Sequence, residues 1–307
     1  MMEKINITFP DGSVKEFDKG ITAFEVAKSI SNRLADEALV SKINGEVRDL
    51  STQINQNVSL QIFTFDNPEG KHTYWHSTSH LMAHAVQSIY PEAKFGVGPA
   101  IDAGFYYDID INSNLTEENL VKIEKKMMEI ISQKNQFKRT ELSKNDAVNF
   151  FKIKGDNYKL EILSELDDKE EVISIYDEGD FTDLCLGPHV PDAGKIKFVK
   201  LLTVSGSYWR GDEKNKQMQR IYGISFPKKK MLDDYLLFLE EAKKRDHRKV
   251  GKQLDLYSIH EEAGAGLIYW HPKGSRIRNT VETFWRKEHL KSGYDLLYSP
   301  HMGKSWL

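Results

Sequence analysis

The sequence predicts a multidomain α+β protein, and three observations lead to this prediction. The chain has 307 residues, more than a usual single domain, so its length favours two or three units that each bury a core. Strand-like runs around one amphipathic helix fill residues 1–64, and helices alternate with strands over residues 65–225. A charged helical stretch over residues 226–250 then leads to a further unit.

The charge balance and the cysteine content exclude several classes of protein. Lysine and arginine number 43 against 46 aspartates and glutamates, a net charge of −3, which argues against a general nucleic-acid coat and restricts any RNA contact to a local basic stripe. One cysteine cannot form an internal disulfide. No apolar run reaches the ~18 residues of a membrane helix, and the N-terminus lacks an apolar signal core. We therefore expect a cytoplasmic protein with no membrane contact.

The first unit, residues 1–64, has the pattern of a β-grasp module. Residues 4–9 alternate apolar and polar side chains, and a Pro-Asp-Gly turn joins them to a second short strand. Thr22 and Glu25 form a capping box at the start of an amphipathic helix. Three further strands are expected at residues 39–43, 46–50 and 58–63. Several strands around one helix in so short a segment indicate a compact α+β fold.

The second unit, residues 65–225, is expected to be a mixed α/β domain. A helix over about residues 74–90 ends at Pro91, and Thr116 caps a long helix whose apolar side chains fall on one face. Strands are expected near residues 95–97, 105–111, 172–176, 198–204 and 220–225. This series of elements is typical of helices packed on a sheet.

Residues 226–250 are expected to form a linker helix, and residues 251–307 to begin a further domain. Cations gather at the far end of the linker helix, namely Lys243, Lys244, Arg245, Arg248 and Lys249. A helix C-terminus, where positive charge is favourable, and an RNA-facing stripe explain them equally well. The last unit has a helix near 275–291 and a strand near 294–299, which cannot bury two faces, so we expect most of its sheet to be missing.

Two pairs of side chains carry the strongest signal for chemistry. His76 and His80 lie four residues apart in an expected helix, so they share one face with Cβ atoms within about 6 Å. Cys185, the single cysteine, is followed four residues later by His189 in a loop stiffened by glycine and proline. Each pair alone is a weak signal, because a lone cysteine is often an inert small hydrophobe. Together the four donors indicate one shared site that holds a metal or activates a water.

Seven motifs extend this interpretation. In chain order they are WHSTSHLMAHA, GFYYDID, DNYKLEI, TDLCLGPHVP, GSYWRGD, QRIYG and KRDHRKVGKQLDL. Following a β-grasp module, they resemble the N-terminal part of bacterial-type threonyl-tRNA synthetases over essentially the whole chain. The resemblance implies a TGS domain at residues 1–64, an editing domain at 65–225 and a linker helix at 226–250. It implies the truncated start of a class II catalytic domain, an antiparallel-sheet fold, at 251–307.

The resemblance also implies a function. Members of this family attach threonine to its tRNA with ATP, and their editing domain hydrolyses serine wrongly esterified to that tRNA. The family's ATP, magnesium and zinc sites lie in a part of the catalytic domain, with motifs 2 and 3, that we expect this sequence to lack. We therefore expect editing without aminoacylation and without a cofactor. The expected partner is threonine tRNA mischarged with serine, which the linker-helix cations would also bind, and the full-length family forms homodimers.

By position, the resemblance also implies the members of the editing site: His76, His80, Lys159, Asp183, Cys185 and His189 as catalytic groups, and Tyr107 as a substrate-holding group. Serine lacks one methyl group of threonine, a difference worth only about 1–3 kcal/mol in a pocket, so a second, hydrolytic site is the usual remedy. We expect His76 or His189 to hold the attacking water, and Lys159 to offset the oxyanion charge. Asp183 is expected to bind the amino or hydroxyl group, and Cys185 to form the pocket wall.

Two alternatives stay open. One is a zinc-dependent deacylase with His76, His80, Cys185 and His189 as ligands, since related alanyl-type editing domains use a similar set of residues for zinc. The other is a non-catalytic tRNA-binding module, in which the TGS domain and the basic end of the linker helix bind RNA.

Overall fold

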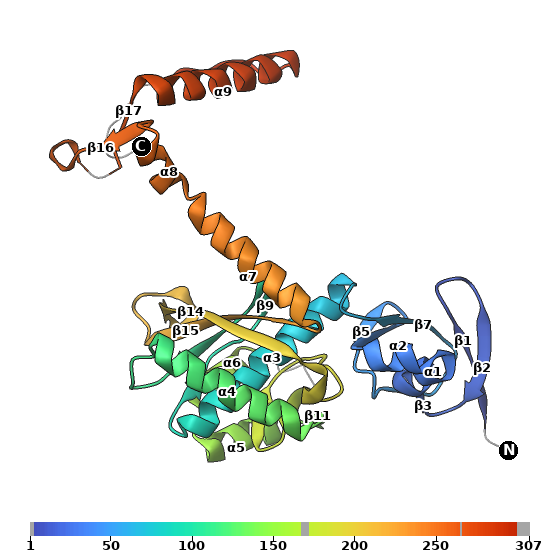
Figure 1. Cartoon of the computed structure of the whole chain (residues 1–307). Helices are drawn as coiled ribbons and strands as arrows, with labels where there is room; N and C mark the ends of the chain where they lie inside the picture. The colour runs from blue at the N-terminus through green and yellow to red at the C-terminus, as the bar shows by residue number, and fades with distance from the viewer. Residues whose placement is uncertain (1–2, 167–171, 265, 300–307) are drawn as a thin grey trace. The chain divides into compact units, whose positions relative to one another are not determined.

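The computed structural model describes residues 3–166, 172–264 and 266–299 (Figure 1). It has the α+β character that the sequence predicts, with several separate sheets. The chain divides into two compact units, Met1–Asp233 and Asp234–Leu307. Among the described helices, none combines the length and the apolar character that crossing a bilayer requires.

The N-terminal sheet has the strand order β2-β1-β7-β4-β5. Its strands are β1 (Lys4–Thr8), β2 (Val14–Asp18), β4 (Val40–Ile43), β5 (Glu46–Arg48) and β7 (Val58–Phe63). The first and last of these, β1 and β7, pair in parallel, and the other neighbours pair antiparallel. A small ladder joins β3 (Ile21–Thr22) to β6 (Gln53–Ile54). A parallel pair of first and last strands with helices in the connection between them is the β-grasp arrangement that the sequence predicts.

Two short helices complete this N-terminal module, which we define as residues 3–64. Helix α1 (Ala23–Ile30) begins at the predicted capping box, in which Thr22 and Glu25 satisfy each other's backbone amides. Helix α2 (Asn32–Glu37) follows at once, with Ser31 as its N-cap. Their apolar faces join the strands in one core that includes Ile7, Val26, Ala27 and Leu60.

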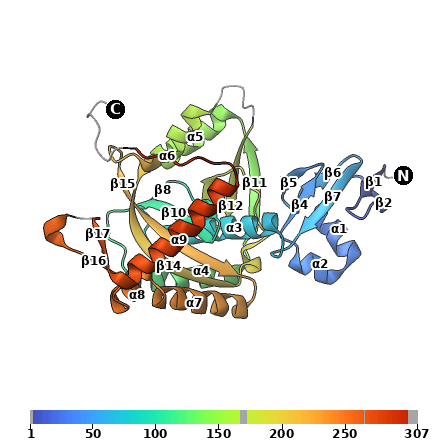
Figure 2. The same cartoon turned by 90° about the horizontal axis from the view of Figure 1, so that it is seen from above.

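The central sheet of the next domain has the strand order β14-β15-β10-β8, with β9 paired to β10. Its strands are β8 (Lys94–Phe95), β9 (Ala100–Ile101), β10 (Gly104–Asp110), β14 (Phe198–Tyr208) and β15 (Gln217–Phe226). Two long helices, α3 (Pro68–Ile89) and α4 (Glu117–Gln133), pack on this sheet and on each other (Figure 2). Helix α3 begins at Pro68, earlier than the predicted start near residue 74, because proline fits the first turn of a helix.

A smaller antiparallel sheet, which the sequence prediction largely missed, lies beside the central one. It consists of β11 (Phe137–Leu142), β12 (Ile173–Glu178) and β13 (Phe181–Leu184). Helices α5 (Lys144–Lys154) and α6 (Asn157–Glu165) share a core with it around Phe151 and Leu163. Short 3-10 turns follow at Ala193–Lys195 and Trp209–Gly211. This sheet and α6 carry two of the predicted site residues, Asp183 and Lys159.

Residues beyond 225 differ from the prediction in two places. The expected linker helix is broken into α7 (Lys229–Lys244) and α8 (His247–Gln253), because Asp246 accepts a hydrogen bond from the Arg248 amide and so caps a new helix. The strand predicted near 294–299 is wrong, since those residues follow α9 (Pro272–Lys291) without pairing to any described strand.

The compact unit Asp234–Leu307 instead contains a hairpin that the sequence prediction missed. It joins β16 (Tyr257–Ile259) to β17 (Ile268–Trp270), with a 3-10 turn at Glu261–Ala263 between them. Residues 300–307 of the predicted last domain lie outside the described residues. The domain boundaries near residues 64, 225 and 250 stay predictions.

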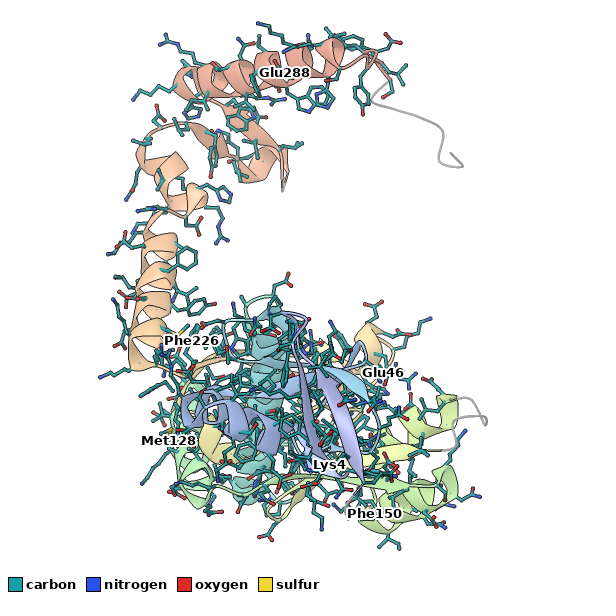
Figure 3. All side chains as sticks on the ribbon, turned by 90° about the vertical axis from the view of Figure 1, so that its right-hand side faces the viewer. Lys4, Glu46, Met128, Phe150, Phe226 and Glu288 are labelled. Atoms are coloured by element: carbon teal, nitrogen blue, oxygen red, sulfur yellow. The ribbon has the colours of Figure 1, made fainter. Side chains whose placement is uncertain are left out.

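The buried face of α4 offers a matched test of the core. Met127 is fully buried and the adjacent Met128, labelled in Figure 3, is 48% exposed. We expect Met127→Ala to lower the free energy of unfolding by about 2–5 kcal/mol, since it removes packed atoms and leaves a cavity. Met128→Ala should change it by less than about 0.5 kcal/mol. Urea unfolding followed by circular dichroism measures both, and equal losses would contradict this packing.

Candidate functional site

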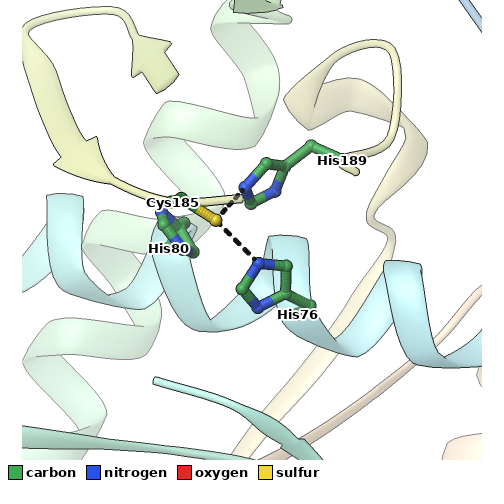
Figure 4. A group of neighbouring side chains, drawn as sticks. All are labelled: His76, His80, Cys185 and His189. Atoms are coloured by element: carbon green, nitrogen blue, oxygen red, sulfur yellow. Dashed lines mark hydrogen bonds between the residues drawn. The ribbon is translucent and has the colours of Figure 1, made fainter. Parts of the chain in front are cut away.

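The two pairs of side chains found in the sequence meet at one place (Figure 4). Helix α3 carries His76 and His80, and the loop after β13 carries Cys185 and His189. Cys185 Sγ lies 3.0 Å from His76 Nε2 and 3.3 Å from His189 Nε2. One ligand atom from each of the four residues lies within 4.8 Å of the others. The fold therefore assembles a four-donor cluster from segments more than 100 residues apart.

The hydrogen bonds around the rings decide which nitrogen of each histidine carries the proton. Ser77 Oγ gives its own proton to the Thr73 carbonyl, so it accepts from His189 Nδ1 at 3.0 Å. His76 Nδ1 faces the Gly98 carbonyl at 3.4 Å, and a carbonyl only accepts. Both rings thus hold their proton on Nδ1 and turn a bare Nε2 toward Cys185.

His80 faces a carboxylate at a longer distance. Its Nδ1 lies 3.7 Å from Asp183 Oδ2, which is too long for a hydrogen bond, and its ring is edge-on to those of His76 and His189, with centroids 4.9 and 4.5 Å apart. His76 and His189 therefore have Nδ1 hydrogen-bonded to the surrounding protein, which leaves Nε2 to accept a proton or bind a metal.

Burial keeps these groups neutral. Loss of solvent, with repulsion from His80, lowers the pKa of His76 to about 3. Burial also lowers the pKa of His80 to about 4, against the attraction of Asp183, and holds that of His189 well below its usual range. The same burial raises the pKa of Cys185 to about 12. At neutral pH the cluster consists of three uncharged imidazoles and a protonated thiol.

A second cluster adjoins the first and contains the site's buried charges. Lys159, Asp183 and Tyr107 are only 3%, 2% and 1% exposed. Lys159 Nζ lies 2.7 Å from Asp183 Oδ1 and also donates to the Gly96 carbonyl at 2.8 Å. The Tyr107 hydroxyl donates to Asp183 Oδ2. Burial opposes ionisation of Asp183, but Lys159, His80 and these hydrogen bonds outweigh it and keep the carboxyl pKa below its ordinary value.

Close backbone approach holds the two clusters together. Residues 96–98 pass beside both, since Gly96 accepts from Lys159 and Gly98 accepts from His76 and from Ser79. A Cβ atom on Gly98 would lie 2.2 Å from the Tyr107 ring, so no larger residue fits without moving that ring. Similarly, Gly187 has a φ of +70° and leaves no space for a Cβ beside the Tyr176 hydroxyl.

All seven predicted editing-site residues thus lie in two touching clusters, while the catalytic roles assigned to them stay predictions. The five linker-helix cations are at the end of α7, in the turn that follows it and on α8, and they are exposed. Glu241 pairs with Lys244 and Arg245, and Asp246 pairs with Arg248. Because acids partly neutralise this stripe, its predicted contact with tRNA stays a prediction.

Sequence reasoning missed the residues that support the site. Ser77 holds His189, but its only signal was its place within the histidine motif. Asp49 accepts from the Tyr176 hydroxyl and from the His189 amide, and neither Asp49 nor Tyr176 shows a motif in the sequence.

The four-donor cluster fits a zinc ion by the chemistry of its donors. A thiol and three imidazoles are ligands that zinc accepts, and Nδ1 hydrogen bonds are the usual outer support of zinc-binding histidines. Binding would require Cys185 to lose the proton that burial favours. If all four residues bound the ion, it would have no free position for water, which is typical of a structural site rather than a catalytic one.

Two family models match the chain. Residues 5–64 match the TGS domain, and residues 173–222 match the threonyl and alanyl tRNA synthetase second additional domain. The second match contains β12, β13, the Cys185–His189 loop and β14.

Curated relatives agree with both family models. The chain is 53% identical over 294 residues to the threonine–tRNA ligase of Caldanaerobacter subterraneus, 50% over 304 residues to that of Cytophaga hutchinsonii and 52% over 296 residues to that of Clostridium botulinum. These matches cover 96–99% of this chain but 45–47% of each relative, so the chain spans about half the length of the curated relatives it matches. The chain therefore carries a TGS domain and a synthetase second additional domain, and over nearly its whole length it is similar to the N-terminal part of threonine–tRNA ligases.

Proposed function

We propose that the two clusters form a hydrolytic editing site, and that its substrate is threonine tRNA esterified with serine. The observation that carries this proposal is the contact between three neutral imidazoles, two of which present a bare Nε2, and a buried ammonium–carboxylate pair. Hydrolysis of an ester requires a base that takes a proton from water and a positive group that stabilises the developing oxyanion. The name of the matching family model, which refers to threonyl and alanyl tRNA synthetases, supports an ester of tRNA as the substrate.

His76 is the best placed of the histidines to hold the attacking water. It is half-buried, whereas His80 and His189 are buried, so water reaches it most readily. Water on His76 Nε2 adds to the ester carbonyl, and its proton passes through the imidazole to the departing ribose oxygen. The products are free serine and a tRNA with a free terminal hydroxyl.

Lys159 and Asp183, the two charged groups of the site, have different roles. The ammonium group of Lys159, held by Asp183 and by Gly96, stabilises the oxyanion. Asp183 Oδ2 accepts from Tyr107, while His80 stands 3.7 Å away. This loosely held position is where a serine amino or hydroxyl group binds. Cys185 is a neutral thiol, too weakly acidic to be the nucleophile, and forms the wall between His76 and His189.

A zinc-dependent deacylase is the second candidate, and the four convergent donor atoms favour it. His76, His80, Cys185 and His189 would supply the ligands, and an ion that acts as a Lewis acid when bound would need one of these four positions left open for water. Lys159, Asp183 and Tyr107 keep the same positions in this alternative, since none of them belongs to the donor set.

Removal of His76 tests the proposal directly. We expect His76→Ala to slow release of serine from mischarged threonine tRNA by about 10²–10⁴-fold, since general base catalysis contributes that much. His72→Ala is the matched control, because His72 lies one turn earlier on α3 and is exposed. Release of labelled serine by the purified chain measures both variants. Release by the unaltered chain no faster than in buffer would refute the proposal.

Metal analysis separates the two candidates. With water activated by histidine alone, we expect the purified chain to contain no stoichiometric zinc and to keep its hydrolysis rate after treatment with a chelator. Elemental analysis and the assay before and after chelation measure this. One zinc per chain, with activity lost on chelation and restored by zinc, would establish the second candidate instead.

The neutral histidines also predict how stability depends on pH. The pKa of His80 falls from 6.5 to about 4 on folding, so between these values the unfolded chain binds a proton that the folded chain does not. Acidification therefore favours unfolding, by up to about 1.4 kcal/mol per pH unit for each such histidine.

We expect the free energy of unfolding to fall less between pH 7 and pH 5 in His80→Gln than in the unaltered chain. The difference is the contribution that His80 alone makes to the loss. Urea unfolding of this variant and of the unaltered chain at both pH values measures the effect, and an equal pH dependence of the two would show that His80 is not held neutral.

A further inference from the structure

A carboxylate of the N-terminal module touches the back of the candidate site. Asp49 follows β5, and its Oδ1 accepts a hydrogen bond from the His189 amide at 2.8 Å. Its Oδ2 accepts from the Tyr176 hydroxyl at 2.7 Å. The Tyr176 ring in turn packs edge-on against the His189 ring, with centroids 4.5 Å apart. One side chain of the first domain thus holds the backbone of His189 and the tyrosine that packs on its ring.

We propose that Asp49 is a positioning residue that fixes His189, and that through it the N-terminal module controls the geometry of the hydrolytic site. The inference rests on the proposed function. It gives the TGS domain a role in the chemistry of the second domain.

The His189 ring is held on several sides, so its placement depends on the loop that carries it. It is stacked between His76 and Phe137, with centroids 4.6 and 4.9 Å away. Ser77 fixes its Nδ1. These contacts orient the ring, but the Asp49 bond is what holds the amide of His189 itself. Burial raises the pKa of Asp49, and the hydrogen bonds from Tyr176 and the His189 amide oppose that rise, so both bonds favour the ionised carboxylate.

A second contact ties the same loop to the same module. Lys195 Nζ donates to the carbonyls of Ala35 and Asp36, at 3.0 and 2.7 Å. These carbonyls lie in the last turn of α2, where a cation is favourable. The segment between β13 and β14 is therefore anchored to the N-terminal module at His189 and again six residues later.

The chemical consequence follows from how precisely a base must be placed. His189 Nε2 lies 3.3 Å from Cys185 Sγ, which in turn contacts His76 Nε2. A shift of the loop would therefore displace the water-holding ring through the thiol. Misplacement of about 1 Å can cost about 10²-fold in rate, while substrate binding by Lys159 and Asp183 would be retained. The expected signature is a loss in kcat with little change in KM.

Four variants of the whole chain test the inference. Asp49→Ala removes both hydrogen bonds, and Asp49→Asn keeps a carbonyl oxygen that can accept from the His189 amide. Asp18→Ala is the matched control, since Asp18 belongs to the same module and its exposed carboxylate pairs with the exposed Lys4. Tyr176→Phe removes a single hydroxyl and serves where Asp49→Ala does not fold.

Two measurements on these variants are needed. Amide hydrogen exchange at His189, followed by NMR, reports the contact whether or not the site is catalytic. We expect exchange about tenfold faster or more in Asp49→Ala, and near the unaltered rate in Asp49→Asn and Asp18→Ala. Serine release should lose about tenfold or more in kcat in Asp49→Ala, with KM within about twofold and with partial recovery in Asp49→Asn.

Each outcome decides the inference. Unchanged exchange in Asp49→Ala, or faster exchange with unchanged kcat, would overturn it. A chain that releases no serine in its unaltered form would refute the proposed function instead, and the exchange result would then alone decide whether Asp49 positions His189. If Asp49→Ala does not fold, Tyr176→Phe should lower kcat without changing KM, and unaltered kinetics in that variant would overturn the inference.

Discussion

The buried carboxylate of Asp183 is the constraint on which the site depends. It stands on β13 and binds Lys159 of α6 and Tyr107 of β10, while His80 of α3 faces it. One charge therefore ties together four elements from both sheets of the second domain and its longest helix. Removing one partner of such a buried pair leaves an uncompensated charge, which typically costs about 3–5 kcal/mol. The fold retains this arrangement beside a cluster of histidines, which is the pattern expected of a reactive site.

Burial makes the charge on Asp183 energetically unfavourable, and the same burial keeps the histidines neutral. Solvent exclusion lowers the pKa of His76 and His80 and raises that of Cys185, so the cluster is neutral while the adjacent pair is charged. A neutral acceptor next to a fixed positive charge suits attack of water on an ester. The bare Nε2 atoms that suit this role also suit a metal, which is why the donor set alone does not separate the two candidates.

Much of the site could be predicted from sequence, because its chemistry follows local spacing. His76 and His80 share a helix face, and Cys185 and His189 share a short stiff loop. The residues that hold these side chains in place could not be predicted from the sequence. Asp49, for example, precedes His189 by 140 residues and carries no motif. The fold shows the same division: the β-grasp module and α4 followed from patterning, while β13 was too short to show a period. The strand expected near 294–299 was wrong because apolar character alone does not supply a partner strand.

The most direct measurement compares release of serine and of threonine from the same threonine tRNA in single-turnover reactions with the purified chain. The buried, tightly packed surroundings of Asp183 and Tyr107 should accept serine and exclude the additional methyl group of threonine. A methyl group is worth about 1–3 kcal/mol, so we expect serine to be released about 10–200-fold faster. Equal rates for the two esters, or no release of serine above the rate in buffer, would contradict a hydrolytic editing site.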